Sequence, residues 1–164
     1  MKLNEVIAKY GNQEVDESKI KEVLVVKESK VWVPKPTELY WYISPSGYLN
    51  KVIFTDSQSD IRQFELGNFF KTREEAEFAR DKQIFLTKFE RYLRENEDEP
   101  VDWKNEGQDK FAIRLDHFDN SRLYFVSWCT IEHQGAIYTT NRLALEQFIK
   151  DNESDIKKYM FGVE

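Results

Sequence analysis

Hydrophobic positions recur at helical spacing in one long segment near the middle of the chain. Between residues 73 and 95, the apolar side chains fall on one side of a helix drawn at about 100° per residue. They are Phe78, Ala79, Phe85, Leu86, Phe89, Tyr92 and Leu93. Thr72 and Glu75 form a capping-box pattern just before them. The pattern therefore predicts an amphipathic helix over 73–95 that packs on a core, with Thr72 as its N-cap.

Two other regions alternate between apolar and polar residues, as antiparallel strands do. The first predicts a hairpin with strands Tyr40–Ser44 and Tyr48–Thr55 around a Ser-Pro-Ser-Gly turn. The second predicts a hairpin with strands Phe111–Leu115 and Leu123–Ile131. The last of these strands is apolar on both faces, which is typical of a central strand covered on both sides or covered by a partner.

A short pattern occurs twice and relates these elements. The sequences GNFFKTREEA, from Gly67, and GAIYTTNRLA, from Gly135, share the spacing of Gly, Thr and Ala. We expect each to pass from a short strand, in 64–70 or 136–138, to a helix capped by the Thr. The second helix is expected over 141–150, and residues 56–60 are expected to form a polar loop. Ser154 is expected to cap a last short helix that stops at Gly162.

The pattern thus predicts two strand–strand–helix pseudo-repeats, over residues 36–95 and 110–164, joined by segment 95–109. Residues 1–35 contain helical spacing on both sides of Gly11 and end in a proline-containing connector. We expect a short N-terminal helical pair there, and a helical hairpin fits better than a DNA-binding helix-turn-helix because no basic surface follows. The predicted fold is α+β, with an antiparallel or mixed sheet packed by helices.

The composition fits a protein of about one domain. The chain has 164 residues and one cysteine, so an internal disulfide framework is excluded and a reducing compartment is expected. No apolar run approaches the roughly 20 residues that a membrane-spanning helix needs. The N-terminus lacks the apolar stretch of a signal peptide. We therefore expect a cytoplasmic protein that does not enter a membrane.

The negative charge is concentrated in segment 95–109. This segment contains seven acidic residues and one lysine, while the whole chain has a net charge of −6. Such a segment can steer a basic partner, although a solvated loop between the two pseudo-repeats is the simpler interpretation. Trp103 is expected to hold the segment against the rest of the protein. The candidate partner-binding residues are Glu95, Glu97, Asp98, Glu99, Asp102, Trp103 and Asp109.

Catalytic and cofactor-binding patterns are missing from the sequence. Cys129 and His133 are too far apart on an extended strand, at about 13 Å, for a cysteine nucleophile and its base. Two histidines and one cysteine provide few ligands for zinc. The six glycines form neither a phosphate-binding loop nor a dinucleotide fingerprint. We therefore expect a non-enzymatic protein without a metal or cofactor.

Aromatic side chains on the predicted strands suggest two alternative functions. Tyr40, Tyr42, Tyr124 and Trp128 are candidates for stacking on a base or another flat ligand. One alternative is a protein that sequesters a nucleotide or small ligand. The other is a single-stranded nucleic-acid-binding protein. Nucleic-acid binding would require four cations around the same sheet face, namely Lys51, Lys71, Arg114 and Arg122.

Four stretches in order along the chain resemble a class of small phage and prophage proteins: LNEVIAKYG, KVWVPKPTELYWYISPSG, FELGNFFKTREEAEFARDKQ and IKKYMFGVE. The resemblance implies a phage-encoded accessory protein that acts in the bacterial cytoplasm and provides no catalytic residue to transfer. It further implies that the chain binds a host protein and inhibits a bacterial defence such as CRISPR. We expect a monomer or a homodimer.

Overall fold

The computed structural model describes residues 31–119, 122–128, 132–133 and 135–163. The chain divides after Val33, and the compact unit that follows runs from Pro34 to Glu164. The predicted N-terminal helical pair and Cys129 lie outside the described residues.

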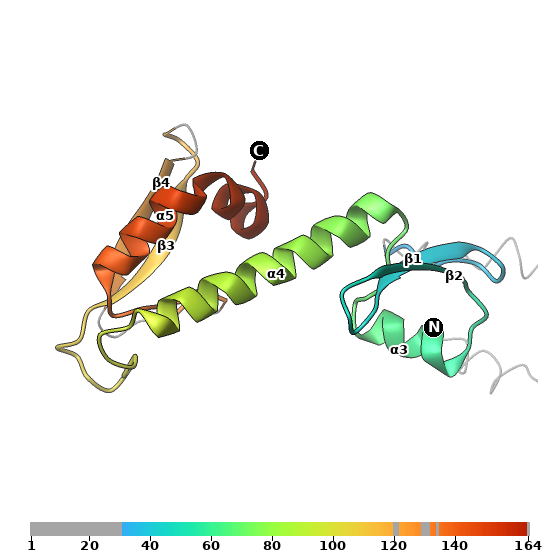
Figure 1. Ribbon diagram of the computed structural model, residues 1–164, viewed down its shortest axis with the longest axis horizontal. Coiled ribbons are helices and arrows are strands. Elements are labelled where there is room, and N and C mark those ends of the chain that lie inside the picture. Colours follow the sequence, from blue (N-terminus) through green and yellow to red (C-terminus); the bar gives the residue numbers. More distant parts are fainter. Residues whose placement is uncertain (1–30, 120–121, 129–131, 134, 164) are drawn as a thin grey trace, which may run out of the picture. The chain divides into compact units, whose positions relative to one another are not determined.

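The elements in chain order are β1 (Leu39–Ile43), β2 (Leu49–Ile53), α3 (Gln58–Glu65), α4 (Arg73–Glu95), β3 (Lys110–Asp116), β4 (Arg122–Trp128), α5 (Arg142–Ile156) and the π-helix η1 (Lys157–Phe161) (Figure 1). The predicted α+β class is confirmed.

Both predicted hairpins are present and antiparallel. The β1–β2 ladder pairs Trp41 with Lys51, and the β3–β4 ladder pairs Ile113 with Phe125. Among the described strands, β1 pairs only with β2 and β3 only with β4, so they form two small sheets. Within the described part of a single chain, β4 therefore has a strand neighbour on one side only and is not a central strand, whereas coverage by a partner stays a prediction.

Helix α3 replaces the polar loop predicted at 56–60 and the strand predicted within 64–70. Ser57 caps the helix and forms a reciprocal capping box with Asp60. The polar run that resembled a loop is therefore the N-terminal end of a helix. Only Phe70 keeps a strand-like pairing, with hydrogen bonds in both directions to Trp41.

The Asp60 carboxylate connects α3 by hydrogen bonds to β1 and to the segment that follows β2. It is 5% exposed and accepts hydrogen bonds from the Tyr40 hydroxyl at 2.7 Å and from the backbone and hydroxyl groups of Thr55 and Ser57. Burial alone would raise the pKa of Asp60, but these hydrogen bonds outweigh it and hold the pKa well below its usual range. Burial and the contact with Asp60 raise the pKa of the Tyr40 phenol well above its usual value.

Helix α4 has the predicted bounds, and Thr72 forms the predicted capping box with Glu75. Its buried face contributes Phe85, Phe89 and Leu93 to the main core. The other buried members of that core come from β3 and α5: Ile113, Leu145, Phe148 and Ile156. The rings of Phe89 and Phe148 lie 4.6 Å apart between their centroids.

Two details of α5 differ from the sequence prediction. Asn141, and not Thr140, is the N-cap, with its side-chain oxygen accepting from the Ala144 N–H at 2.9 Å. The backbone is non-helical at Asn152, so α5 consists of two helical parts as expected, but the break lies at Asn152 and not at Ser154. Burial of Ile156 holds the second part against the core. The predicted stop at Gly162 is confirmed by its left-handed backbone, with a φ of 66°.

The position of the cap can be tested by substitution. Asn141→Ala is expected to lower the free energy of unfolding by about 1 kcal/mol, because the first turn of α5 loses a side-chain acceptor. Asn141→Ser should retain most of the stability because serine also caps helices well. Urea denaturation measures both differences, and equal stability of the wild type and Asn141→Ala would contradict the assignment.

Candidate functional site

The acidic segment 95–109 links the end of α4 to β3, and one buried lysine organises its backbone. Lys110 is 0% exposed although it is the first residue of β3. Its Nζ donates to the backbone oxygens of Asn105 at 2.9 Å and Gln108 at 2.7 Å. The same ammonium lies 5.5 Å from the centre of the Trp103 ring. The Lys110 ammonium therefore holds the backbone of the last turn of the segment, residues 105–108, in place.

The side chain of Gln108 connects the C-terminal end of the segment to its middle. It is 6% exposed. Its amide nitrogen donates to the Pro100 oxygen at 3.0 Å, and its oxygen accepts from the Asp102 N–H at 2.7 Å. Satisfying both backbone groups inside the protein restricts the paths that the segment can adopt.

Further contacts attach the segment to the start of α5. The Thr140 hydroxyl donates to the Glu99 oxygen at 2.7 Å, and the Asn141 amide donates to the Asp98 carboxylate at 3.0 Å. The Trp103 ring meets Tyr138 edge-on, with centroids 4.9 Å apart. The expectation that Trp103 holds the segment against the rest of the protein is confirmed by this contact.

The structure presents most of the predicted acidic residues to solvent. Five of the candidate residues are exposed: Glu95, Asp98, Glu99, Asp102 and Asp109. Glu97 and Trp103 are half-buried. Asp109 accepts from the Ser127 hydroxyl at 2.7 Å. Among the described residues, Glu95, Glu97 and Glu99 take part in no ion pair, so no neighbouring cation competes with an approaching partner for them.

Sequence reasoning missed three residues of this site. Glu106 is an exposed carboxylate that was not selected. Lys110 and Gln108 were not recognised as the residues that shape the segment, since a lysine at a strand start is normally exposed. No local pattern marks them, because their hydrogen-bond acceptors are backbone oxygens. Across the described part of the chain, no group of three or more His, Cys, Asp or Glu residues is placed to hold a metal ion.

The aromatic candidates do not form one surface. Tyr40 is 2% exposed and stacks on Phe69, with ring centroids 3.9 Å apart, so it is a core residue and cannot stack on a ligand. Tyr42 is half-buried in the same hairpin. Tyr124 is 42% exposed, but it lies in β4 of the other sheet. Trp128 ends β4 and pairs with Lys110 along the backbone.

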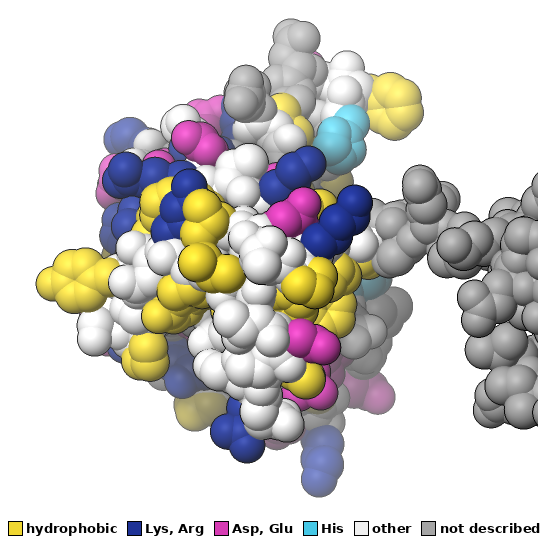
Figure 2. Space-filling model, turned by 90° about the vertical axis from the view of Figure 1, so that its right-hand side faces the viewer, with side chains coloured by type: hydrophobic (Ala, Val, Ile, Leu, Met, Phe, Trp, Pro, Cys, Tyr) yellow, Lys and Arg dark blue, Asp and Glu magenta, His cyan; other side chains and the backbone are white. Residues whose placement is uncertain are grey.

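The cations required for nucleic-acid binding are also divided. Lys51 belongs to β2, whereas Arg114 and Arg122 belong to β3 and β4, and Lys71 precedes α4. Arg114 lies opposite Tyr124 in the ladder, but Lys51 lies opposite Trp41 in the other sheet. On the face drawn in Figure 2, basic side chains lie beside hydrophobic ones. The described residues therefore do not place the four cations around one sheet face.

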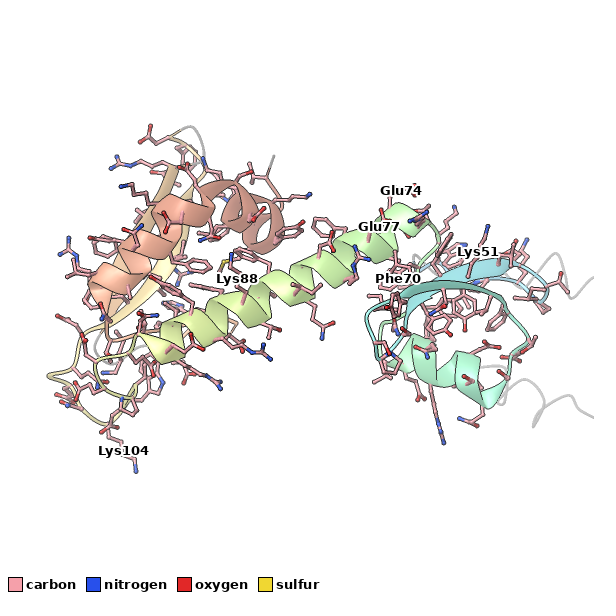
Figure 3. All side chains as sticks on the ribbon, viewed as in Figure 1. Lys51, Phe70, Glu74, Glu77, Lys88 and Lys104 are labelled. Atoms are coloured by element: carbon pink, nitrogen blue, oxygen red, sulfur yellow. The ribbon has the colours of Figure 1, made fainter. Side chains whose placement is uncertain are left out.

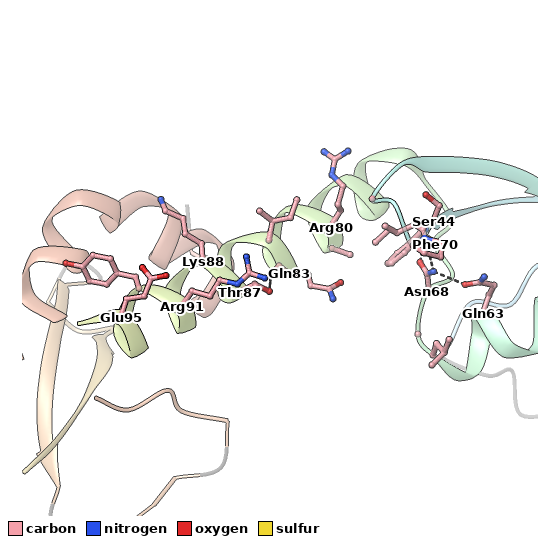
Figure 4. Close-up of a pocket in the computed structure, with 18 residues that line it drawn as sticks. Ser44, Gln63, Asn68, Phe70, Arg80, Gln83, Thr87, Lys88, Arg91 and Glu95 are labelled. Carbon is pink, nitrogen blue, oxygen red and sulfur yellow. Dashed lines mark hydrogen bonds between the residues drawn. The ribbon is translucent and has the colours of Figure 1, made fainter. Parts of the chain in front are cut away.

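An open concavity of about 1030 Å³ lies along α4. The turn after β1, the end of α3 and the outward side of α4 line it (Figure 4). Of its cations, Arg80 is paired with Asp81 at 2.8 Å and Lys88 donates to Asn152 at 3.0 Å. Small-ligand sites usually enclose most of the ligand surface. This open shape gives little support to sequestration of a nucleotide.

Comparisons with protein-family models, with curated proteins and with solved structures find no match for this chain. None of the helices within the described residues has the length and apolar content that a membrane crossing requires. The site's own geometry is therefore the basis for an interpretation of function.

Proposed function

We propose that the chain is a non-enzymatic binding protein that recognises a basic protein surface through the acidic segment 95–109. One observation carries this proposal: a segment with seven acidic residues is held in a defined conformation by the buried Lys110 and Gln108. A flexible acidic loop would lose conformational entropy on binding. A segment ordered in advance avoids much of that cost and gains affinity accordingly.

The charge of the segment defines the partner by its chemistry. Exposed carboxylates complement a protein surface rich in lysine and arginine, and such complementarity raises the association rate. Proteins that bind nucleic acid carry such surfaces. With the resemblance to phage proteins, this supports a phage-encoded accessory protein acting in the host cytoplasm. We propose that it occupies the basic surface of a host protein, and that this partner belongs to a nucleic-acid-directed defence such as CRISPR.

Neutralising the acidic segment should weaken binding at low salt. The variant replaces Glu97→Gln, Asp98→Asn, Glu99→Gln and Asp102→Asn in one chain. Exposed charge pairs are each worth about 0.2–1 kcal/mol, so four together predict a loss of about 0.8–4 kcal/mol, which is roughly fourfold to several hundredfold in affinity. A tagged protein first captures its partner from a bacterial host, and titration calorimetry with the purified partner then measures affinity.

The matched control also removes four negative charges, but from other exposed positions. It replaces Glu65→Gln, Glu74→Gln, Glu90→Gln and Asp155→Asn. We expect this control to bind with nearly the affinity of the wild type. Equal losses in the two variants would mean that only net charge matters, and equal affinity of wild type and segment variant would remove the segment from the proposal.

The proposed inhibition of host defence has its own measurement. Expression of the wild type should raise phage plating on a strain that carries the targeted defence and leave plating on a defence-deficient strain unchanged. The segment variant should lose this effect. If a protein partner is bound but plating does not change for any defence tested, binding would stand and the inhibitory role would be wrong.

A further inference from the structure

Among the described residues, the backbone groups at the outer edge of β4 have no hydrogen-bond partner. On the far side of β3, Phe111 exchanges hydrogen bonds with Thr139 at 2.8 and 3.1 Å. The backbone N–H and C=O groups of Phe111 therefore point away from β4. Phe111 and Ser127, which lie opposite each other in the ladder, form a non-hydrogen-bonded pair. Because such pairs alternate along an antiparallel ladder, the backbone groups of Leu123, Phe125 and Ser127 point away from β3.

The edge is open along the described part of β4. No backbone hydrogen bond given for the described residues reaches Leu123, Phe125 or Ser127 from that side. Tyr124 and Ser127 are exposed at this edge, and α5 lies against the sheet face, not along its edge (Figure 1). A row of outward donors and acceptors is a template for pairing with another strand.

The other sheet of the same chain protects its edge. Trp41 bonds to Phe70 on the far side of β1, so the same reasoning makes Leu49, Lys51 and Ile53 the outward residues of β2. Lys51 is exposed in the middle of that row (Figure 3). Lysine at this position discourages the approach of a further strand.

The β4 edge has no comparable protection. From Leu123 to Ser127 the strand contains no charged residue, no proline and no glycine, and only Arg122 at its start carries a charge. Identical β4 edges therefore approach each other without a like charge between Leu123 and Ser127.

We propose that β4 pairs antiparallel with β4 of a second copy of this chain, so that the two hairpins form one four-stranded sheet. Antiparallel pairing of two identical strands is related by a two-fold axis, and Phe125 is the central one of the three outward residues. In this register, Phe125 lies opposite itself and Leu123 lies opposite Ser127. On the other face Tyr124 lies opposite Val126, an aromatic–β-branched pair of the kind that stabilises sheets.

The helix that covers this sheet is compatible with the pairing. The Arg142 guanidinium of α5 lies 4.5 Å from the centre of the Phe125 ring. Its Nε donates to Glu146 at 2.8 Å. The two-fold axis therefore brings together two neutralised Arg–Glu pairs and not two unpaired cations. This inference uses no residue of the acidic segment, so it stands or fails independently of the proposed function.

A proline substitution in β4 tests the outer edge of the strand without removing a hydrogen bond between β4 and β3. Ser127→Pro removes an outward N–H but no hydrogen bond to β3, because Ser127 is in a non-hydrogen-bonded pair. Ser127→Ala is the matched control, since both variants lose the hydroxyl contact with Asp109. Light scattering and sedimentation of the full chain should give twice the chain mass of 19.6 kDa for the wild type and Ser127→Ala. Ser127→Pro should give the mass of one chain.

Amide hydrogen exchange in the wild type locates the interface without any substitution, so it decides the question even if Ser127→Pro fails to fold. The amides of Leu123, Phe125 and Ser127 should exchange slowly in concentrated protein and at least tenfold faster after dilution to the monomer. The Lys51 amide should exchange rapidly at both concentrations. A wild type that is monomeric at all concentrations would overturn the proposal. A dimer in which these three amides remain unprotected would overturn it equally, as would protection that depends on a host protein.

Discussion

Asp60→Ala is expected to lower the free energy of unfolding by about 3–5 kcal/mol, the largest effect of any single polar substitution proposed for this protein. The alanine leaves the buried Tyr40 hydroxyl and the donors of Thr55 and Ser57 without their common acceptor. It also removes half of the capping box of α3. Tyr40→Phe, which deletes one donor, should cost about 1–2 kcal/mol. Chemical denaturation measures both.

The same carboxylate predicts a specific dependence on pH. The hydrogen bonds hold the pKa of Asp60 well below its usual value, so the carboxylate stabilises the folded state above the pKa of an unfolded Asp, about 3.9. That stabilisation should be fully present above about pH 5 and should fall progressively as the pH drops below about 4. The stability difference between wild type and Asp60→Asn should shrink over the same range.

Glu65→Gln is the control for this experiment, because Glu65 is an exposed carboxylate on the same helix. It should change stability by no more than about 0.5 kcal/mol at any pH. A stability difference for Asp60→Asn that stays constant from pH 6 to pH 3, or an equal loss in Glu65→Gln, would show that the Asp60 charge does not support the fold.

Lys110→Ala is expected to be the second large effect, with a loss of about 2–4 kcal/mol. The ammonium is fully buried, and its removal takes a donor from the oxygens of Asn105 and Gln108, of which the Asn105 oxygen keeps the Gln108 N–H at 3.3 Å. The acidic segment should then exchange its amides faster and, if our functional proposal holds, bind its partner more weakly. Denaturation measures the first effect, and amide exchange measures the second.

Two further substitutions separate the causes. Lys110→Met keeps most of the apolar stem but none of the donors, so it should recover part of the stability and leave the segment loosened. Lys104→Ala removes the other lysine next to the site, whose side chain extends away from the ribbon in Figure 3. It should leave stability within about 0.5 kcal/mol of the wild type. Normal exchange of the segment in Lys110→Met would contradict the role given to the ammonium.

Local patterns were sufficient where the determinants lie close together in sequence. The bounds of α4 follow from its apolar stripe and the capping box of Thr72 and Glu75, all of which act within a few residues. Both hairpins follow from strand alternation. The same reasoning failed at 56–60, where a polar run was interpreted as a loop although Ser57 and Asp60 form a capping box of the kind recognised at Thr72.

The candidate site was located by composition but not understood from it. The seven acidic residues of segment 95–109 indicated a special region, and Trp103 was correctly expected to attach it. Its conformation depends on Lys110 and Gln108, which bond to backbone oxygens and leave no sequence pattern. The cap of α5 shows the same limit: Thr140 and Asn141 are both good capping residues, and Thr140 is engaged by Glu99 instead.

The sequence by itself determined the α+β class, the long helix, the two hairpins and the location of the negative charge. These properties depend on side-chain periodicity and on contacts between near neighbours. Only the tertiary structure decided that Tyr40 is buried on Phe69 and that Lys110 lies beneath the acidic segment. It also decided that β4 pairs with one strand, β3, among the described residues. Burial and strand order depend on which distant segments meet, and this choice is made by the packing of the whole core.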